Sequence, residues 1–359
     1  MKENYFKERN ERNIKKTREI VADLPGFAAE FFIGIATHTS PLTRLNYAYD
    51  LRVFFDYLAK IKFRGHIEIT EISLKDLETL QAYDIETYLE YLTSYVFRDR
   101  EFRCGESAKE RKLCSLRSFF KYYFKKDKLP SNITVKVDLP KKHHKSIVRL
   151  EVDEVVKLLN QAESGSMPTV KQEQYHLLTK TRDVALLTLF LGTGIRISEC
   201  IGINREDIDF TSNAFTVTRK GGDTSTLYFS NEVADALKDY IAWLDRQVEE
   251  KTPFGAKIKQ TNALFLSTRG NRICVRAVEN LVQKYSKLIT PLKKITPHKL
   301  RSTYGTTLYR ETQDIYIVAD VLGHKDVNTT KKHYADMSDE IRRAAANVVK
   351  LRENNNKDK

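Results

Sequence analysis

"TRDVALLTLFLGTGIRISE", residues 181–199, joins the longest apolar run of the chain to a glycine turn and an arginine. The run is too short to span a bilayer, so it predicts a buried helix that ends at Gly194. Arg196 then stands at the start of the next helix. A guanidinium there can present a bidentate fork to phosphate oxygens, beside backbone N–H groups. Alternatively, Arg196 is a surface arginine that pairs with Glu199.

A predicted β-hairpin follows this arginine. Residues 214–230 alternate in hydrophobicity on both sides of Gly221 and Gly222, which is the pattern of two strands joined by a tight turn. Lys220 stands at the tip, where a long ammonium side chain can reach a neighbouring groove. A lysine at a hairpin tip can also serve solubility alone.

A third candidate is the pair His298 and Arg301. Thr296 as cap and Pro297 at the first helical position predict that a helix begins here. The pair then lies at i and i+3 on one helical face. An imidazole that handles protons beside a guanidinium that binds phosphate suits phosphoryl chemistry. The alternative is a partly buried histidine and a surface arginine.

The fourth stretch, "LGHKDVNTTKKHY", covers residues 322–334. It contains Gly323, a common helix stop, followed by His324, and it ends on Tyr334. By itself the stretch does not distinguish a nucleophilic tyrosine from an ordinary residue of an amphipathic helix. The phosphate-binding groups have to come from the rest of the chain.

The N-terminal half is predicted to be mainly helical, with helices near 43–58, 84–97 and 107–126 and no strand signal of comparable strength. The third helix has one basic face interleaved with aromatic residues, which indicates either contact with a nucleic-acid backbone or a solvated helix surface. The expected DNA contacts of this half and of the linker after it are Arg44, Lys109, Arg111, Lys112, Arg117, Lys141, Lys142 and Lys145.

The charge and the domain boundaries agree with such a partner. The formal charge of the chain is +13, which favours a polyanion, although some basic proteins have no such ligand. Residues 139–149, "LPKKHHKSIVR", contain no acidic side chain and predict an extended basic linker. We therefore expect a helical DNA-binding domain at 1–138, a mixed domain at 150–351, and a disordered tail at 352–359.

Several classes of protein are disfavoured by the sequence. The four cysteines are widely spaced, without a CxxC pair or a histidine cluster, which argues against a metal site and a disulfide framework. The N-terminus is too charged for a signal peptide. We find no phosphate-cradling P-loop. The expectation is a cytoplasmic protein that uses neither metal nor another cofactor and does not contact a membrane.

Taken together, "GTGIRISE", "TRKGG", "PHKLRSTYGT" and "LGHKDVNTTKKHY" resemble the catalytic domain of tyrosine recombinases, the phage-integrase and Xer family. The N-terminal stretches "YAYDLRVFFDYL" and "RKLCSLRSFFKYYF" resemble the core-binding domain of that family. The resemblance spans about residues 25–350. Within the family, "TVTRKGGDTSTLYF" and "ITPHKLRSTYGTTLY" are similar to the single-protein XerS-type recombinases.

The resemblance implies a role for each candidate position. The roles are phosphate binding for Arg196 and Arg301, general acid for Lys220, assistance in proton transfer for His298, a phosphate hydrogen bond for His324, and nucleophile for Tyr334. Fixed cations would stabilise the charge of the transition state without metal ions. The covalent 3′-phosphotyrosine link would conserve the bond energy, so that rejoining needs no ATP.

The resemblance also implies architecture and partners. The expected fold is mainly α with a small β-hairpin sheet in the catalytic domain, and the two domains would close as a clamp on duplex DNA. Four protomers would synapse two recombination sites, and a DNA translocase or directionality factor could act with them. Residues 338–351 carry an apolar stripe that would dock on a neighbouring protomer or on their own domain.

Other activities fit the same motifs. A type IB topoisomerase would use similar residues to nick and reseal one duplex. A catalytically silent DNA-binding protein could share the fold. Within recombination, resolution of chromosome dimers and integration or excision of a mobile element need the same chemistry, so the sequence leaves the biological role open.

Overall fold

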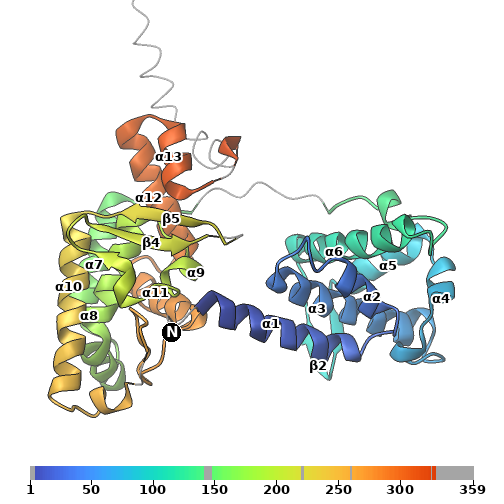
Figure 1. Ribbon diagram of the computed structural model, residues 1–359, viewed down its shortest axis with the longest axis horizontal. Coiled ribbons are helices and arrows are strands. Elements are labelled where there is room, and N and C mark those ends of the chain that lie inside the picture. The colour runs from blue at the N-terminus through green and yellow to red at the C-terminus, as the bar shows by residue number, and fades with distance from the viewer. Residues whose placement is uncertain (1–4, 141–147, 220–221, 259–260, 325, 329–359) are drawn as a thin grey trace, which may run out of the picture. The chain divides into compact units, whose positions relative to one another are not determined.

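The computed structural model describes residues 5–140, 148–219, 222–258, 261–324 and 326–328. The described residues up to 140 form one compact unit, and those from 148 onward form a second (Figure 1). Most of the expected linker, residues 139–149, lies outside the described residues. In the described part of the chain, no helix is long and apolar enough to cross a membrane. All four cysteines are unpaired thiols.

The N-terminal unit is built from short and medium helices around an aromatic core. Its elements are α1 (Tyr5–Ala22), α2 (Ala28–Gly34), α3 (Pro41–Tyr57), η1 (Leu58–Lys62), η2 (Ile69–Glu71), α4 (Leu74–Glu78), α5 (Ala82–Tyr91), β1 (Tyr95–Phe97), β2 (Arg100–Phe102), α6 (Glu106–Lys125) and η3 (Ile133–Lys136). Helix α3 packs against α1 and α6. Ser40 caps α3 by accepting a hydrogen bond from Thr43 N, and Pro41 is the first helical residue, which confirms the predicted start.

Aromatic side chains fix how α3 and α6 meet. Phe54, Phe55 and Phe119 are fully buried. The rings of Phe55 and Phe119 lie edge to face, with their centroids 5.8 Å apart. Such pairs add to the free energy gained by burying the rings. The two predicted helices are therefore held in a single register by their apolar faces.

The helix expected at 84–97 is wrong at its C-terminal end. Helix α5 stops at Tyr91, and the chain then forms the antiparallel hairpin β1–β2, which the sequence reading did not predict. Arg98 and Asp99 have φ of 50° and 59°, the left-handed conformation that a two-residue hairpin turn of type I′ needs at both positions. The apolar spacing continues past the end of α5, to Leu92 and Val96, so periodicity did not reveal the break.

The second unit packs other helices and a small sheet around one long helix whose C-terminal half is buried. Its elements are α7 (Val152–Ser164), α8 (Val170–Thr193), α9 (Ile197–Cys200), η4 (Arg205–Asp207), β3 (Ile208–Asp209), β4 (Ala214–Thr218), β5 (Thr224–Tyr228), α10 (Asn231–Glu249), η5 (Gly255–Lys257), α11 (Val275–Ile289), α12 (Pro297–Thr312) and α13 (Ile315–Leu322). Helix α8 packs against α7, α10 and α12 (Figure 1). It begins well before the predicted start at residue 181 and ends, as predicted, at Gly194.

The sheet has the order β3-β4-β5 and is antiparallel throughout. Ala214 pairs with Tyr228 and Thr218 with Thr224, so β4 and β5 form the predicted hairpin. Beyond the last strand pair, Arg219 N donates to Asp223 O at 2.7 Å and extends the pairing toward the turn of the hairpin. The expectation of a mainly helical fold with a small β-hairpin sheet is confirmed.

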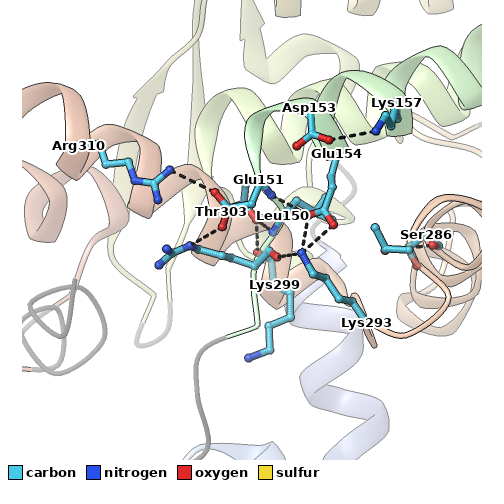
Figure 2. A network of polar contacts seen from close by, with 12 residues as sticks. Leu150, Glu151, Asp153, Glu154, Lys157, Ser286, Lys293, Lys299, Thr303 and Arg310 are labelled. Atoms are coloured by element: carbon cyan, nitrogen blue, oxygen red, sulfur yellow. Dashed lines mark hydrogen bonds and ion pairs between the residues drawn. The ribbon is translucent and has the colours of Figure 1, made fainter. Parts of the chain in front are cut away.

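Polar contacts tie the start of α7 to α12 (Figure 2). Leu150 N donates to Thr303 Oγ1 at 3.0 Å, and Arg310 Nη1 reaches Glu151 Oε2 at 3.4 Å. Lys293, in the loop before α12, donates to Glu154 Oε2 at 2.6 Å. Because α12 carries His298 and Arg301, this network fixes the helix that presents two of the candidate residues.

Candidate active site

Arg196 is held at the beginning of α9 by two different partners. Its backbone N and its Nη1 donate to the two carboxylate oxygens of Glu199, at 3.0 and 2.8 Å. Its Nη2 donates to the carbonyl of Gly323 at 2.9 Å. Glu199 is only 4% exposed, whereas about a third of the Arg196 side chain, 34%, faces solvent. The pairing with Glu199 thus exists, but it orients the arginine instead of leaving it on an open surface.

Arg301 lies in the interior of the same unit. It is 5% exposed, so the alternative of a surface arginine does not hold. Nη1 donates to Gly194 O at 2.5 Å, and Nη2 donates to Leu322 O. These carbonyls belong to the C-terminal ends of α8 and α13, where helix carbonyls lack intrahelical partners and carry partial negative charge. A guanidinium satisfies both at once.

The turn Leu322–Gly323 is where the two arginines meet. Their acceptors there are the carbonyls of consecutive residues, although Arg196 is 127 positions from Gly323 and Arg301 is 21 from Leu322. Gly323 has φ of 61°, a left-handed conformation typical of glycine after a helix. His324 follows directly, half-buried, and its backbone N donates to Ala319 O at 2.9 Å. The structure therefore brings together Arg196, Arg301 and His324.

His298 is exposed in the first turn of α12, one helical turn before Arg301. The alternative of a partly buried histidine therefore does not hold, and the imidazole is accessible to a ligand. Its backbone carbonyl accepts a hydrogen bond from Ser302 Oγ at 3.0 Å.

Two of the six predicted catalytic residues, Lys220 and Tyr334, lie outside the described residues, as does the segment 338–351. The described residues contain no group of three or more His, Cys, Asp or Glu side chains placed to hold a metal ion.

Sequence reasoning missed Arg219, which precedes Lys220 in "TRKGG". Its guanidinium lies against Gly323, so closely that a Cβ at position 323 would overlap Nη1. Its position before the hairpin tip was visible in the sequence, but its contact with a turn much further along the chain was not. Arg219 is thus the third arginine at the Leu322–Gly323 turn.

One of the predicted DNA contacts is a structural residue instead. Lys112 is 6% exposed, and its Nζ donates to Asp50 Oδ1 at 3.1 Å; Asp50 itself is 1% exposed. Ser115 Oγ and Arg111 Nη1 donate to the other oxygen of this carboxylate. Lys112 therefore does not belong to the exposed basic face that the sequence predicted, because it neutralises a buried charge between α3 and α6.

The other predicted contacts in the N-terminal unit remain at or near the surface. Arg111 is half exposed, and Lys109 lies 3.6 Å from Glu106. Arg117 donates to Val137 O at 2.7 Å, and Arg44 donates to Ala36 O at 2.6 Å. The remaining predicted contacts, Lys141, Lys142 and Lys145, lie outside the described residues.

Comparison with known proteins places this geometry in a family. A sequence model described as "Phage integrase family" matches residues 148–340, more than half of the chain. The chain belongs to the phage integrase family. Within it, the chain is a tyrosine recombinase, an enzyme that breaks and rejoins DNA strands, and its relatives support site-specific recombination over the alternative activities considered from the sequence.

Two relatives illustrate the similarity. Tyrosine recombinase XerC of Caldanaerobacter subterraneus subsp. tengcongensis is 34% identical over 318 residues, which cover 86% of this chain and 81% of the relative. Tyrosine recombinase XerS of Streptococcus thermophilus is 27% identical over 361 residues, which cover 93% of this chain and 98% of the relative. The likeness to XerS thus extends over almost the full length of both proteins.

Solved structures show the same fold. The XerH recombinase in a post-cleavage complex with its difH substrate superposes with a TM-score of 0.63 at 19% identity, covering 86% of this chain and 80% of XerH. The Tn1549 transposon integrase in complex with circular intermediate DNA gives a TM-score of 0.62 at 19% identity, covering 88% and 97%.

Proposed function

We propose that Tyr334 cleaves one strand of a duplex DNA recombination site and becomes joined to its 3′-phosphate. The phenol oxygen forms a bond to phosphorus while the bond from phosphorus to the 5′-oxygen breaks. Lys220 protonates that leaving oxygen, and His298 assists proton transfer. The 5′-hydroxyl of a second strand then attacks the phosphotyrosine, which releases Tyr334 and rejoins the DNA.

The observation that carries this proposal is the meeting of Arg196 and Arg301 at one turn. Phosphoryl transfer places negative charge on the non-bridging oxygens, and fixed cations aimed there lower the barrier. Arg196 has more N–H donors than its bonds to Glu199 and Gly323 use, and a third of its side chain is exposed. It can therefore bind a phosphate without leaving its supports. His324 follows the same turn and supplies a further donor.

The nature of the substrate is supported by the DNA-bound relatives. XerH binds difH, the Tn1549 integrase binds circular intermediate DNA, and a lambda integrase dimer binds a core site. For this chain we infer a double-stranded recombination site, enclosed by the two units as a clamp. The basic residues of the N-terminal unit, Lys112 excepted, and of the linker would bind its backbone.

The assembly and the biological role extend the same proposal. A homotetramer on two synapsed sites accounts for exchange of strands between duplexes. The near full-length similarity to XerS favours a single Xer-type recombinase that resolves chromosome dimers in the cytoplasm, with integration of a mobile element as the other role. A translocase or directionality factor could control either reaction.

A nicked suicide substrate tests the proposed chemistry. The full chain is incubated, without metal or ATP, with nicked duplexes from the neighbourhood of its own gene, and denaturing electrophoresis detects covalent protein–DNA adducts. We expect an adduct with the wild type and none with Tyr334→Phe. A Tyr334→Phe protein that still forms the adduct overturns the assignment of the nucleophile.

A further inference from the structure

Arg219 occupies an unusual position for a charged side chain. Its backbone lies at the base of the β4–β5 hairpin. There its N donates to Asp223 O at 2.7 Å, and its O accepts a hydrogen bond from Gly222 N at 3.1 Å. The side chain crosses to the turn after α13 and packs on Gly323. The φ of 61° favours glycine at 323, and a Cβ there would also have to displace this guanidinium, which is the far end of a flexible side chain.

The guanidinium is only partly satisfied. Its Nε and Nη1 are buried and have no hydrogen-bond partner among the residues that the structure describes. Buried donors of a cation that lack an acceptor cost free energy, and native proteins keep few of them. By contrast, Arg196 and Arg301, beside the same turn, each donate to a backbone carbonyl of it.

The local charge sharpens this contrast. Three guanidinium groups approach the Leu322–Gly323 turn, and the carboxylate seen to pair with one of them, Glu199, is engaged by Arg196. A cluster of cations with free donors is the usual composition of a site for a phosphate. The Arg219 residue as a whole keeps part of its surface exposed, so rotation about its side-chain bonds can bring the buried donors to the solvent-exposed surface.

We propose that Arg219 is a further phosphate-binding residue of the active site, which lies against Gly323 and donates through Nε and Nη1 to a phosphate oxygen of the bound strand. This inference rests on the proposed function. Since Arg219 directly precedes Lys220, the same contact would position the hairpin that carries the proposed general acid.

The test uses Arg219→Met, which retains an unbranched apolar side chain but removes the charge and all donors. Arg219→Lys keeps the charge without the planar fork. Arg246→Met is the matched control, because Arg246 lies in the last turn of α10 and donates to Ala242 O of its own helix. Three quantities are measured in the full chain: melting temperature without DNA, single-turnover adduct formation on the nicked duplex, and the dependence of duplex affinity on salt.

The expected pattern separates a phosphate contact from a packing role. Arg219→Met should melt at the wild-type temperature or above it, because an unpaired buried cation has been removed. Adduct formation should slow about 10- to 100-fold, as for the loss of a charged hydrogen bond. The slope of log affinity against log salt should become shallower by about one unit, with Arg219→Lys between this variant and the wild type and Arg246→Met unchanged.

Two outcomes overturn the inference. The first is an Arg219→Met protein with the wild-type cleavage rate and salt slope. The second is a variant that melts lower and loses activity in proportion with an unchanged salt slope, which indicates that Arg219 only packs. If the wild type itself forms no adduct, the proposed function fails, but the salt slope of non-covalent binding still tests Arg219 by itself.

Discussion

Arg196 and Arg301 donate to consecutive carbonyls of one turn, those of Gly323 and Leu322. Protein carbonyls thus hold both guanidinium groups. Both use the partial negative charge at the end of α13, and Arg301 adds the end of α8 through Gly194 O. Because protein groups orient these cations, less reorganisation is needed in the reaction. The stability of the turn and the activity of the site are therefore coupled.

Replacing Arg301 should impair both folding and catalysis. Arg301→Met leaves the carbonyls of Gly194 and Leu322 without their donor, at a cost of about 2–4 kcal/mol in the free energy of unfolding. Adduct formation should fall at least about 100-fold. Arg310→Met, on the same helix but at a partly exposed ion pair with Glu151, should cost under about 1 kcal/mol. Urea denaturation and single-turnover cleavage measure the two effects; equal losses in both variants would contradict the coupling.

The carboxylate behind Arg196 should act on catalysis through orientation. Glu199→Gln keeps the size of the side chain but removes the charge that holds Nη1 and the backbone N of Arg196. We expect cleavage to slow about tenfold while duplex affinity changes little, because the arginine keeps its charge. Glu232→Gln, on the exposed first turn of α10, is the control and should react at the wild-type rate. Unaltered cleavage in Glu199→Gln would mean that Gly323 alone orients Arg196.

Steric contact at Gly323 can be separated from backbone strain. Gly65 also has positive φ, 75°, but open space around its Cα, so Gly65→Ala should cost about 1–2 kcal/mol from strain alone. Gly323→Ala must in addition displace the Arg219 side chain and should therefore cost more than Gly65→Ala. Arg219→Ala introduced together with Gly323→Ala should recover the excess, which a double-mutant cycle in urea reads as a coupling energy. If the effects of the two substitutions on the free energy of unfolding simply add, Arg219 does not constrain position 323.

The buried charge of the N-terminal unit gives a stability prediction. Asp50→Ala leaves Lys112 buried without its carboxylate and should cost about 3–5 kcal/mol. Lys112→Met should change the free energy of unfolding but leave the salt dependence of DNA binding unaltered. Lys121→Met, at an exposed position of the same helix α6, provides the control, with no expected change in stability. If the slope of log DNA affinity against log salt became shallower in Lys112→Met, Lys112 would be a DNA contact after all.

The features that the sequence predicted depend on residues close together in the chain, whereas those that it missed depend on residues far apart. The helix stop at Gly194, the hairpin around Lys220 and the pairing of Arg196 with Glu199 depend on neighbours within a few positions, and periodicity and turn residues indicate them. The contact of Arg196 with Gly323 and that of Lys112 with Asp50 join positions far apart in the chain. No local pattern encodes such distances.

The burial of Lys112 and that of Arg301 have the same origin. Lys112 stands beside the apolar face of α6, and only a carboxylate on another helix makes its burial favourable. Arg301 has a charged side chain, and its burial is favourable because the carbonyls of two other helix ends accept its hydrogen bonds. In both cases the decisive partner is electrostatic and non-local.

The most direct test of the account identifies the residue that carries the DNA. The adduct formed by the wild type on the nicked substrate is digested with nuclease and protease, and mass spectrometry locates the peptide that retains a phosphate or nucleotide. The account predicts a single modified residue, Tyr334. Modification of another tyrosine, such as Tyr316 at the exposed start of α13, would contradict it.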